Sequence, residues 1–494
     1  MRDSVRFILD GRVEEVRQCN PTETVLDFLR NEKGRVGTKE GCAEGDCGAC
    51  TVVVVEVAGD ALRYRAVNAC ILFLPTLDGK QLITVEDLQT ADGALHGVQR
   101  AMVEQHGSQC GFCTPGFVMS LFAMFHMQNG RAPSRQEIDE NLAGNLCRCT
   151  GYAPIVRAAQ QSLTTDRSDQ FNQHEKGVLE QLKAWRDEDL LAMEHGGRHY
   201  FAPTTREQLC TLLDTHPGAT MVAGATDVGL WVTKQLQQID TLVYTGMVAE
   251  LNIVEFDEAG GVLAIGAAVT YTRALSHILD IYPDFEELLS RLGAVQVRNV
   301  GTIGGNIANG SPIADMPPAL IALGTRLVLA SSDGERTIDL EDFFVAYGKQ
   351  DLQPGECISR ILLPLPEQNQ QFRTYKLSKR FEQDISAVCV AFCVDIRDGK
   401  VSSVRACYGG MAETPRRAMH CEEALMGQPW NEQSIDQAMR ALQRDFEPIS
   451  DMRASAQYRM SAAQNLLKRF FLETSDKPFP VRLEPRYSQS GATP

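Results

Sequence analysis

The chain has 494 residues, and at roughly 150 residues per domain this length predicts about three domains. Its composition, 44% hydrophobic and 23% charged with 40 Gly and 21 Pro, excludes disorder, collagen and coiled coil. The formal net charge of -16 disfavours non-specific binding to nucleic acid or to an anionic membrane surface, because both reward Lys and Arg. The acidic balance therefore indicates small molecules or protein partners.

Neither the N-terminal stretch nor any later one is apolar enough for a signal peptide or a membrane span. We therefore expect a cytoplasmic protein without membrane contact, in which the 15 cysteines stay reduced and serve a purpose other than disulfides. Nine of these cysteines fall within the first 149 residues, so the chemistry they carry is concentrated there.

The pattern of residues 1–88, the first segment, predicts a small mixed sheet that packs on one helix. Residues 5–17 alternate around Asp10-Gly11, which is typical of a β-hairpin, and 22–30 form an amphipathic stretch. Residues 51–57 and 62–66 alternate as two further strands.

A Gly-rich loop before the second strand pair carries Cys42, Cys47 and Cys50, and Cys70 follows later in the chain. The spacing C-x4-C-x2-C…C is typical of plant-type 2Fe-2S clusters, in which four thiolates hold two irons. Small residues such as Gly41 let the backbone wrap closely around such a cluster. A four-cysteine zinc site, or buried thiols that bind nothing, remain the alternatives.

Residues 89–165 turn to helical periodicity and predict an all-α bundle. Leu95, Val98 and Met102 share one face, and Pro115 occupies the first turn of a helix that ends before Gly130. Two more helices are predicted from the capping box of Ser134 and Glu137 and from the stretch 153–163. His96, His106 and His126 are interpreted as surface histidines with ordinary partners rather than as ligands.

The ends of these helices carry Cys110 and Cys113, then Cys147 and Cys149. A C-x2-C pair alone fits zinc as well as redox chemistry. Beside a plant-type cluster, a second four-thiolate set indicates a relay of two one-electron carriers, with a structural zinc clip as the alternative.

Three stretches, Val36–Val52, Gln109–Gly116 and Asn145–Tyr152, resemble the iron–sulfur region of the molybdenum hydroxylases. That family includes xanthine dehydrogenase and aldehyde oxidase. The resemblance implies two 2Fe-2S clusters, because all eight ligand positions of the family's motifs are Cys here: Cys42, Cys47, Cys50, Cys70, Cys110, Cys113, Cys147 and Cys149.

Residues 166–194 are polar with few apolar anchors and are predicted to be a linker, and His195–His199 a loop. From 195 to 370 the pattern is mixed α and β, with Gly-rich loops at 221–228 and 299–307. Asp315 is a predicted N-cap before two prolines. Neither the dinucleotide fingerprint nor a P-loop occurs here, so these loops alone indicate turns and no nucleotide.

The flavoprotein domain of the same family carries similar loops in the same order and holds FAD without a Rossmann unit. The resemblance therefore implies an FAD-binding domain of the vanillyl-alcohol-oxidase-like type. Leu292 stands where the family has an aromatic residue, and Gln383 where many animal relatives are acidic. The FAD contacts implied are Met221, Val222, Ala223, Gly224, Ala225, Thr226, Asp227, Val228, Leu292, Gly301, Thr302, Ile303, Gly304, Gly305, Asn306, Asp315 and Lys376.

Residues 371–476 predict strands followed by helices, an α+β flavoprotein C-terminal cap, and 477–494 a Pro-rich tail. The cysteines of the cap are interpreted as packed apolar side chains. The fold class expected is multidomain α+β: a β-grasp ferredoxin-like 2Fe-2S domain, an all-α 2Fe-2S four-helix bundle, an FAD-binding domain and this cap.

Carried over the whole chain, the resemblance implies the small, electron-transferring subunit of a molybdenum hydroxylase of the xanthine dehydrogenase type. A large subunit would bind molybdopterin, since 494 residues leave no room for it, and the two would form a heterotetramer with two copies of each. NAD would accept the electrons, and no side chain is assigned a catalytic role. The alternatives are an aldehyde or N-heterocycle oxidoreductase, a stand-alone diaphorase oxidising NADH, or a zinc-clipped scaffold without enzymatic activity.

Overall fold

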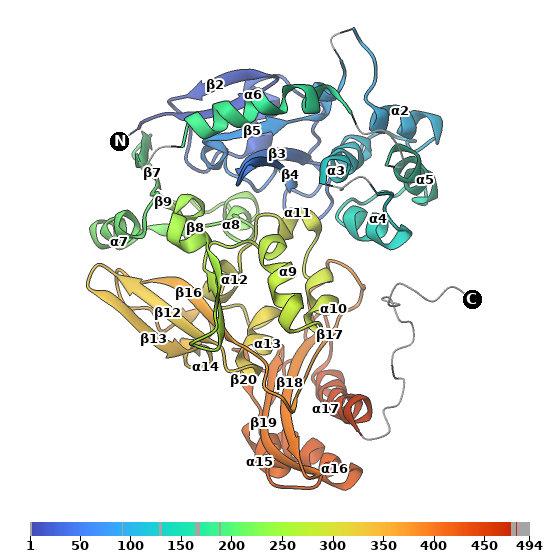
Figure 1. The fold of residues 1–494 in the computed structure, drawn as a ribbon, viewed down its shortest axis with the longest axis vertical. Helices are drawn as coiled ribbons and strands as arrows, with labels where there is room; N and C mark the ends of the chain where they lie inside the picture. The colour runs from blue at the N-terminus through green and yellow to red at the C-terminus, as the bar shows by residue number, and fades with distance from the viewer. Residues whose placement is uncertain are drawn as a thin grey trace.

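The computed structural model describes residues 2–90, 92–127, 131–163, 168–186 and 189–475, together with Val481. The chain builds an elongated molecule, in which the first two units lie side by side at one end and the units that follow in sequence extend from them along the long axis (Figure 1). The expected multidomain α+β fold class is confirmed. Apart from Val481, the predicted tail 477–494 lies outside the described residues, as do Gly130 and the first two residues of the predicted linker.

The N-terminal unit is a five-stranded sheet in the order β2-β1-β5-β3-β4, in which β1 and β5 run parallel. The predicted hairpins are confirmed as β1 with β2 and β3 with β4. The fifth strand was missed because it is only four residues long. The strands are β1 (Val5–Leu9), β2 (Arg12–Val16), β3 (Thr51–Ala58), β4 (Ala61–Asn68) and β5 (Lys80–Ile83).

The predicted helix of this unit begins after Thr24, whose side chain accepts a hydrogen bond from the backbone of Asp27. It consists of α1 (Val25–Asp27) and a π-helical turn (Phe28–Glu32), and it buries its apolar side chains on the sheet. Short 3₁₀ turns follow at Leu74–Leu77 and Val85–Leu88.

Four helices form the second unit. The central helix, α3, is buried along most of its length and packs on β3 and β4, so the two units share a core. The capping box of Ser134 is confirmed, whereas Leu95 lies before the first helix and is exposed, so its predicted place on the apolar face was wrong. The helices are α2 (Gly97–Glu104), α3 (Thr114–Met127), α4 (Arg135–Leu142) and α5 (Ala153–Ser162).

The segment predicted as a linker contains a helix, α6 (Gln170–Ala184), that lies along the first two units (Figure 1). Its Leu182 packs against Ile8 and Val57 of the ferredoxin-like sheet. The segment therefore has apolar anchors, which its polar composition concealed.

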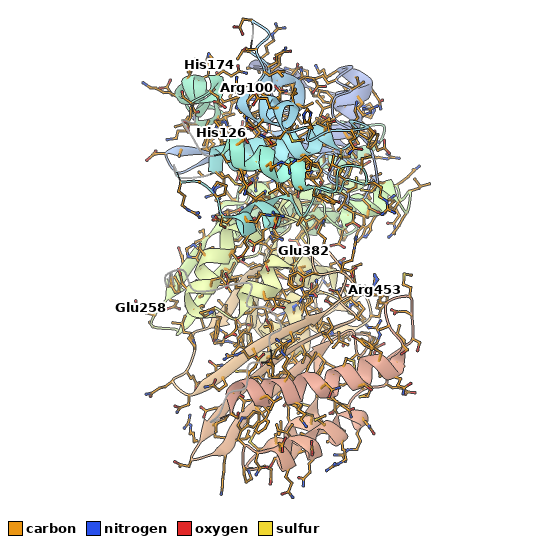
Figure 2. All side chains as sticks on the ribbon, turned by 90° about the vertical axis from the view of Figure 1, so that its right-hand side faces the viewer. Arg100, His126, His174, Glu258, Glu382 and Arg453 are labelled. Atoms are coloured by element: carbon orange, nitrogen blue, oxygen red, sulfur yellow. The ribbon has the colours of Figure 1, made fainter. Side chains whose placement is uncertain are left out.

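The N-cap of α6, Asp169, joins this helix to the helical unit. One carboxylate oxygen, Oδ2, lies 3.0 Å from His96 Nε2 and 2.9 Å from His126 Nε2. The three side chains are only 3–6% exposed, so the interpretation of His96 and His126 as surface histidines was wrong. Both histidines have a hydrogen-bond partner, as expected, but that partner is Asp169, so the two contacts fix the start of α6 in place. Figure 2 shows His126 within the upper part of the molecule.

The third unit holds two main sheets, in the orders β6-β7-β9-β8 and β10-β11-β16-β12-β13. Strand β6 begins inside the predicted linker. Of the predicted loop 195–199, only Gly196 and Gly197 form the turn between β6 and β7. The loop prediction was wrong for His195, Arg198 and His199, which are paired in the two strands. The strands are β6 (Leu191–His195), β7 (Arg198–Ala202), β8 (Thr220–Val222), β9 (Thr241–Tyr244), β10 (Val254–Asp257), β11 (Val262–Gly266), β12 (Arg326–Ser331), β13 (Gly334–Asp339), β14 (Phe344–Ala346), β15 (Lys349–Gln350) and β16 (Cys357–Pro364).

Helices surround these sheets and supply most of the core of the third unit. Two 3₁₀ turns, Thr245–Met247 and Ala249–Asn252, accompany them. The helices are α7 (Arg206–Thr215), α8 (Val228–Thr233), α9 (Tyr271–Ile281), α10 (Phe285–Ser290), α11 (Val295–Arg298), α12 (Ile303–Asn309), α13 (Met316–Ala322) and α14 (Leu340–Phe343).

The C-terminal unit is a four-stranded sheet whose central strand, β18, is buried on both faces. Phe392 and its even-numbered neighbours face α15, α16 and α17, whereas Cys389 and Cys393 face α13. The buried cysteines are packing residues, as expected. The elements are β17 (Gln370–Leu377), β18 (Val388–Arg397), β19 (Lys400–Gly409), β20 (Arg416–Arg417), α15 (Met419–Leu425), α16 (Glu432–Ala441), a 3₁₀ turn (Leu442–Arg444) and α17 (Ala456–Thr474).

Among the helices of the described ranges, none combines the length and the apolar character needed to cross a lipid bilayer.

From the contacts of Asp169 with His96 and His126, which we call the Asp169 clamp, we predict how α6 responds to mutation and pH. Burial alone would raise the pKa of Asp169, but the hydrogen bonds with His126 and His96 outweigh it and lower that pKa. The stabilisation is therefore present above the ordinary aspartate pKa and is lost as pH falls toward the depressed value. We expect Asp169→Asn to cost about 1–3 kcal/mol of unfolding free energy and to speed amide exchange in residues 170–184.

Amide hydrogen exchange and urea unfolding measure both effects. Glu180→Gln on the exposed face of the same helix is the control and should leave both unchanged. Equal exchange rates in the Asp169 variant and the wild type would contradict the clamp.

Candidate functional site

The first set of cysteines meets at a loop between the π-helical turn and β3, joined by Cys70 from the end of β4. Cys42 contacts Cys47 and Cys70, and Cys70 also contacts Cys50. Cys50 and Cys70 are only 1% and 3% exposed. The structure thus brings together four thiols that the sequence separates by up to 28 positions.

Backbone amides point at one sulfur of this set. Cys42 Sγ accepts from the N–H of Glu44 at 3.5 Å and from those of Asp46 and Cys47 at 3.3 Å. Hydrogen bonds from the Cys47 and Cys70 thiols and from these amides lower the pKa of Cys42 far below the ordinary thiol value. The loop thus favours a thiolate, the form that binds metal.

Glycine is required where this loop turns back on itself. A Cβ on Gly41 would lie 2.7 Å from Cys47 Sγ, too close for any side chain. Gly48 has a φ of +69°, and a Cβ there would meet the carbonyl of Gly144 in the helical unit. The small residues predicted to wrap a cluster are therefore also those that seat one unit on the other.

The second set of cysteines lies where α3 and α5 begin. Cys149 Sγ is 3.6 Å from Cys110 Sγ, and Cys113 contacts Cys147. Thr150 donates from its amide at 3.5 Å and its hydroxyl at 3.3 Å to Cys147 Sγ. Burial would raise the pKa of Cys147, but these hydrogen bonds outweigh it and lower that pKa.

Exposure distinguishes the two sets. Cys110 and Cys149 are exposed, whereas in the first set Cys50 and Cys70 are buried. Among the described residues, no three His, Cys, Asp or Glu side chains surround one point closely enough to hold a single metal ion. In the second set the thiols instead lie in contacting pairs, and in a 2Fe-2S cluster each iron is held by two of the four protein ligands.

The two cysteine loops touch, and a buried polar network joins them to the third unit. Leu146 N donates to Cys47 O at 3.0 Å. Asn145 Nδ2 donates to Gly48 O at 3.0 Å, while Gln296 Nε2 of α11 donates to Asn145 Oδ1 at 3.0 Å. Asn145 and Gln296 are 2% and 1% exposed, so these bonds form away from water.

The loop after β17 closes the same junction from below. Gln383 Nε2 donates to Ala143 O of the helical unit. Its neighbour Glu382, labelled in Figure 2, lies at the level where the upper and central parts of the molecule meet. Gln383 therefore has a place in the packing between units.

A cavity of ≈ 560 Å³ opens in the third unit between its two Gly-rich loops. All residues of 221–228 line it, as do Leu292, Gly301, Thr302, Gly304, Gly305 and Asn306. A Cβ on Gly224 would meet the carbonyl of Val300, so glycine lets the two loops approach each other. Loops far apart in sequence thus form one wall. The resemblance implied that both loops contact FAD, and that role stays a prediction.

Some polar atoms of the cavity wall lack hydrogen-bond partners in the part of the chain that the structure describes. Tyr271 Oη and Asn306 Oδ1 are buried and make no hydrogen bond to any described residue. Buried polar groups are nearly always hydrogen-bonded, so such atoms indicate a ligand that completes them. The size is that of a site for a cofactor or a part of one.

Three predicted contacts lie outside the cavity lining. Ile303 is fully buried in the core, and Asp315 and Lys376 bind each other. Lys376 Nζ donates to Asp315 Oδ2 at 2.5 Å, and Ser386 Oγ to Asp315 Oδ1 at 2.5 Å. Asp315 occupies the predicted N-cap position of α13, but its side chain makes no capping bond because it faces Lys376.

The structure also adds residues that the sequence analysis missed. They lie outside the two Gly-rich stretches 221–228 and 299–307, so only the folded chain shows that they face the cavity. The clearest are the side chains of Trp231, Tyr271 and Ile358 and the carboxamide of Asn309.

The first cysteine set lies next to this cavity. Thr233 Oγ1 of α8 donates to Ala43 O in the cysteine loop at 2.8 Å. Gly229 of the same helix has no room for a Cβ, because Ile71, next to Cys70, packs against it. Val228 begins α8 and lines the cavity, so one helix contacts both sites. The order in space is therefore second cysteine set, first cysteine set, cavity.

Four family descriptions match the chain in the order of these sites. Residues 7–74 match "2Fe-2S iron-sulfur cluster binding domain", and 84–160 match "[2Fe-2S] binding domain". Residues 193–366 match "FAD binding domain in molybdopterin dehydrogenase", and 373–474 match "CO dehydrogenase flavoprotein C-terminal domain". The chain belongs to the molybdenum hydroxylase family. Within that family, it matches the iron–sulfur domains and the flavoprotein domains.

Curated relatives of this molybdenum hydroxylase chain include larger proteins. It is 32% identical over 530 aligned residues to the xanthine dehydrogenase of Emericella nidulans, covering 95% of this chain and 38% of that protein. It is 28% identical to the xanthine dehydrogenase/oxidase of Gallus gallus, covering 96% of this chain and 40% of that one. The chain therefore spans about two fifths of the length of these relatives.

Solved structures from the same family resemble part of the chain. Carbon monoxide dehydrogenase from Hydrogenophaga pseudoflava matches with a TM-score of 0.52 and 27% identity, covering 55% of this chain and 94% of that one. Quinoline 2-oxidoreductase from Pseudomonas putida 86 matches with a TM-score of 0.51 and 27% identity, with the same coverage of 55% and 94%.

The contact between the two Gly-rich loops predicts the effect of Gly224→Ala. The added methyl group would meet the Val300 carbonyl and push the loops apart, at a cost of about 1–3 kcal/mol. We expect the purified variant to contain less bound flavin than the wild type, measured by flavin absorbance per chain. Gly218→Ala, at a position with open space, is the control and should retain its flavin. Normal flavin content in the Gly224 variant would contradict the cavity assignment.

Proposed function

We propose that the chain is the electron-transfer subunit of a xanthine dehydrogenase. In this function electrons pass from a molybdenum centre on a partner subunit, through two 2Fe-2S clusters, to FAD and on to NAD during oxidation of hypoxanthine and xanthine to urate. The observation that carries the proposal is the spatial order of the sites. The second cysteine set, of which Cys110 and Cys149 are exposed, contacts the more buried first set, and the first set in turn contacts the cavity.

The cysteine sets fit the two clusters. Cys42, Cys47, Cys50 and Cys70 would hold one of them, and Cys110, Cys113, Cys147 and Cys149 the other. The amides around Cys42 and the Thr150 hydroxyl would donate to ligand sulfurs, an arrangement that tunes the potential of such sites.

The cavity fits FAD. Loop residues 221–228 and 301–306 would bind and position it, and Tyr271 Oη and Asn306 Oδ1 offer polar atoms that make no hydrogen bond to the described residues. Leu292 would contribute apolar packing where family members use a ring. Lys376 stands behind this wall, 3.4 Å from the carbonyl of Arg291, and with Asp315 would set the local charge.

When bound, the clusters exchange single electrons and the flavin couples them to the transfer of a hydride, which is how NAD takes up electrons. No side chain of this chain is required as acid, base or nucleophile. Its residues bind the cofactors, hold them in contacting units and exclude water between them.

We propose a molybdopterin-binding large subunit as the partner, in a heterotetramer with two copies of each subunit. The support is that the relatives named xanthine dehydrogenase are about two and a half times as long as the aligned part of this chain. We propose a cytoplasmic location because none of the 15 cysteines, all of which lie in the described ranges, forms a disulfide, as expected in a reducing compartment.

A second candidate is the same unit serving another molybdenum hydroxylase. The structural likeness to carbon monoxide dehydrogenase and quinoline 2-oxidoreductase favours it, since these act on other substrates. The substrate is chosen on the partner, so the sites described above would serve either enzyme.

Purification of the native complex tests both candidates. We expect a co-purifying molybdenum-containing subunit, about four irons per chain in two 2Fe-2S clusters, one FAD, and xanthine-dependent reduction of NAD. Oxidation of aldehydes or N-heterocycles but not of xanthine or hypoxanthine would favour the second candidate. Zinc without iron or flavin would support the scaffold alternative, and NADH-dependent dye reduction without any partner would support the diaphorase.

Replacing one ligand should remove one cluster. We expect Cys147→Ser to abolish one of two paramagnetic 2Fe-2S signals and to block electron flow to NAD, while the other signal and FAD remain. The reason is that the two sets lie on separate units with separate ligands. Cys19→Ser, a buried thiol outside both sets, is the control and should keep both signals. Loss of both signals in the Cys147 variant would contradict independent sites.

A further inference from the structure

A second cavity, of ≈ 490 Å³, lies between the ferredoxin-like unit and the FAD-binding unit. Strands β3 and β4 line it from one side, the end of α6 from another, and the start of α9 from the third. It meets the flavin cavity at a shared wall made of Ala223, Gly224, Ala268 and Thr302. Ala223, Gly224 and Thr302 are also proposed FAD contacts, but the other residues that line this cavity belong neither to those contacts nor to the cysteine sets.

This cavity is basic within a chain of net charge -16. Five lining side chains are Arg or Lys, and two are acidic. Arg2 pairs with Asp78 at 2.7 Å, and Arg65 pairs with Glu56, which neutralises both carboxylates.

Three cationic side chains of the lining remain: Lys80, Arg186 and Arg273. None of them pairs with a carboxylate of the described residues. Lys80 Nζ donates to Thr76 O at 2.6 Å and lies 3.2 Å from Tyr244 Oη. Arg273 donates to the backbone and side chain of Asn252, at 2.8 Å and 3.3 Å.

The wall also holds polar atoms without partners. Arg65 Nε and Thr270 Oγ1 are buried and make no hydrogen bond among the described residues. Burial, followed by repulsion from Arg63 and Arg65, lowers the pKa of Arg273 despite attraction from Glu56. Positive charge is therefore costly in this cavity, and an anion would relieve the cost.

We propose that this cavity binds a compact phosphate-bearing anion between the iron–sulfur and flavin units. Guanidinium groups match phosphate oxygens with paired, charge-assisted hydrogen bonds, and an ammonium adds a point charge. Tyr244 and Trp185 give the cavity aromatic surface beside these cations, enough for the organic part of a phosphate ester. The ligand would bridge the ferredoxin-like unit and the FAD-binding unit. The cofactor sites depend on how these two units pack against each other.

Calorimetric titration of pyrophosphate into the purified protein with its cofactors bound tests the site, at low ionic strength. Saturation with FAD occupies the other cavity, so binding there is excluded. We expect one pyrophosphate site per chain. In Arg273→Gln and in Lys80→Gln the dissociation constant should rise by about tenfold or more, because each variant loses a charge-assisted hydrogen bond. Arg100→Gln, on the exposed face of α2, removes the same charge elsewhere and should bind like the wild type.

Inorganic phosphate and ADP distinguish a free anion from a phosphate carried on an organic group, and citrate tests carboxylates. If Arg273→Gln fails to retain FAD and both cluster signals, Lys80→Gln decides. Absence of saturable binding, equal binding in all variants, or citrate binding more tightly than both phosphate compounds would overturn the proposal.

Discussion

The arrangement of the sites depends on one buried amide network. Gln296 Nε2 of the FAD-binding unit donates to Asn145 and Ser120 of the helical unit and to Thr51 of the ferredoxin-like unit, so a single carboxamide joins three units. All four side chains are 5% exposed or less, and Asn145 extends the network to the Gly48 carbonyl in the first cysteine loop. An amide pair in such a place is strong because water cannot compete, and its loss would leave buried groups without partners.

This network explains why small residues cluster around it. Gly48, Gly116 and Gly144 each lack room for a Cβ because backbone or network atoms of another segment lie against them. Close backbone approach brings the two cysteine loops together, and single-electron transfer between centres benefits from short separations. The packing of the units requires glycine at these few positions. The proposed electron relay requires the same glycines, because they let the two cysteine loops approach each other.

The sequence predicted what short-range chemistry determines. Cysteine spacing identified both thiol sets, the Asp10-Gly11 turn gave the first hairpin, and the Ser134 capping box gave α4. It failed where partners are distant. Asp169 and His126 are 43 positions apart, and Asp315 exchanges its capping role for Lys376, 61 positions away. Polar residues at such separations carry no periodic signal, so the linker seemed to have few anchors and His126 seemed to lie at the surface.

The same limit applies to the boundary between the iron–sulfur and flavin units. Arg65 Nη1 donates to Asn299 O at 2.6 Å, and Asn299 Nδ2 donates back to Ala66 O at 2.9 Å. Asn299 begins the second Gly-rich loop, so β4, the strand that leads to Cys70, also positions this part of the flavin cavity. Two hydrogen bonds and one strand therefore connect the two cofactor sites, and the basic cavity lies beside that connection.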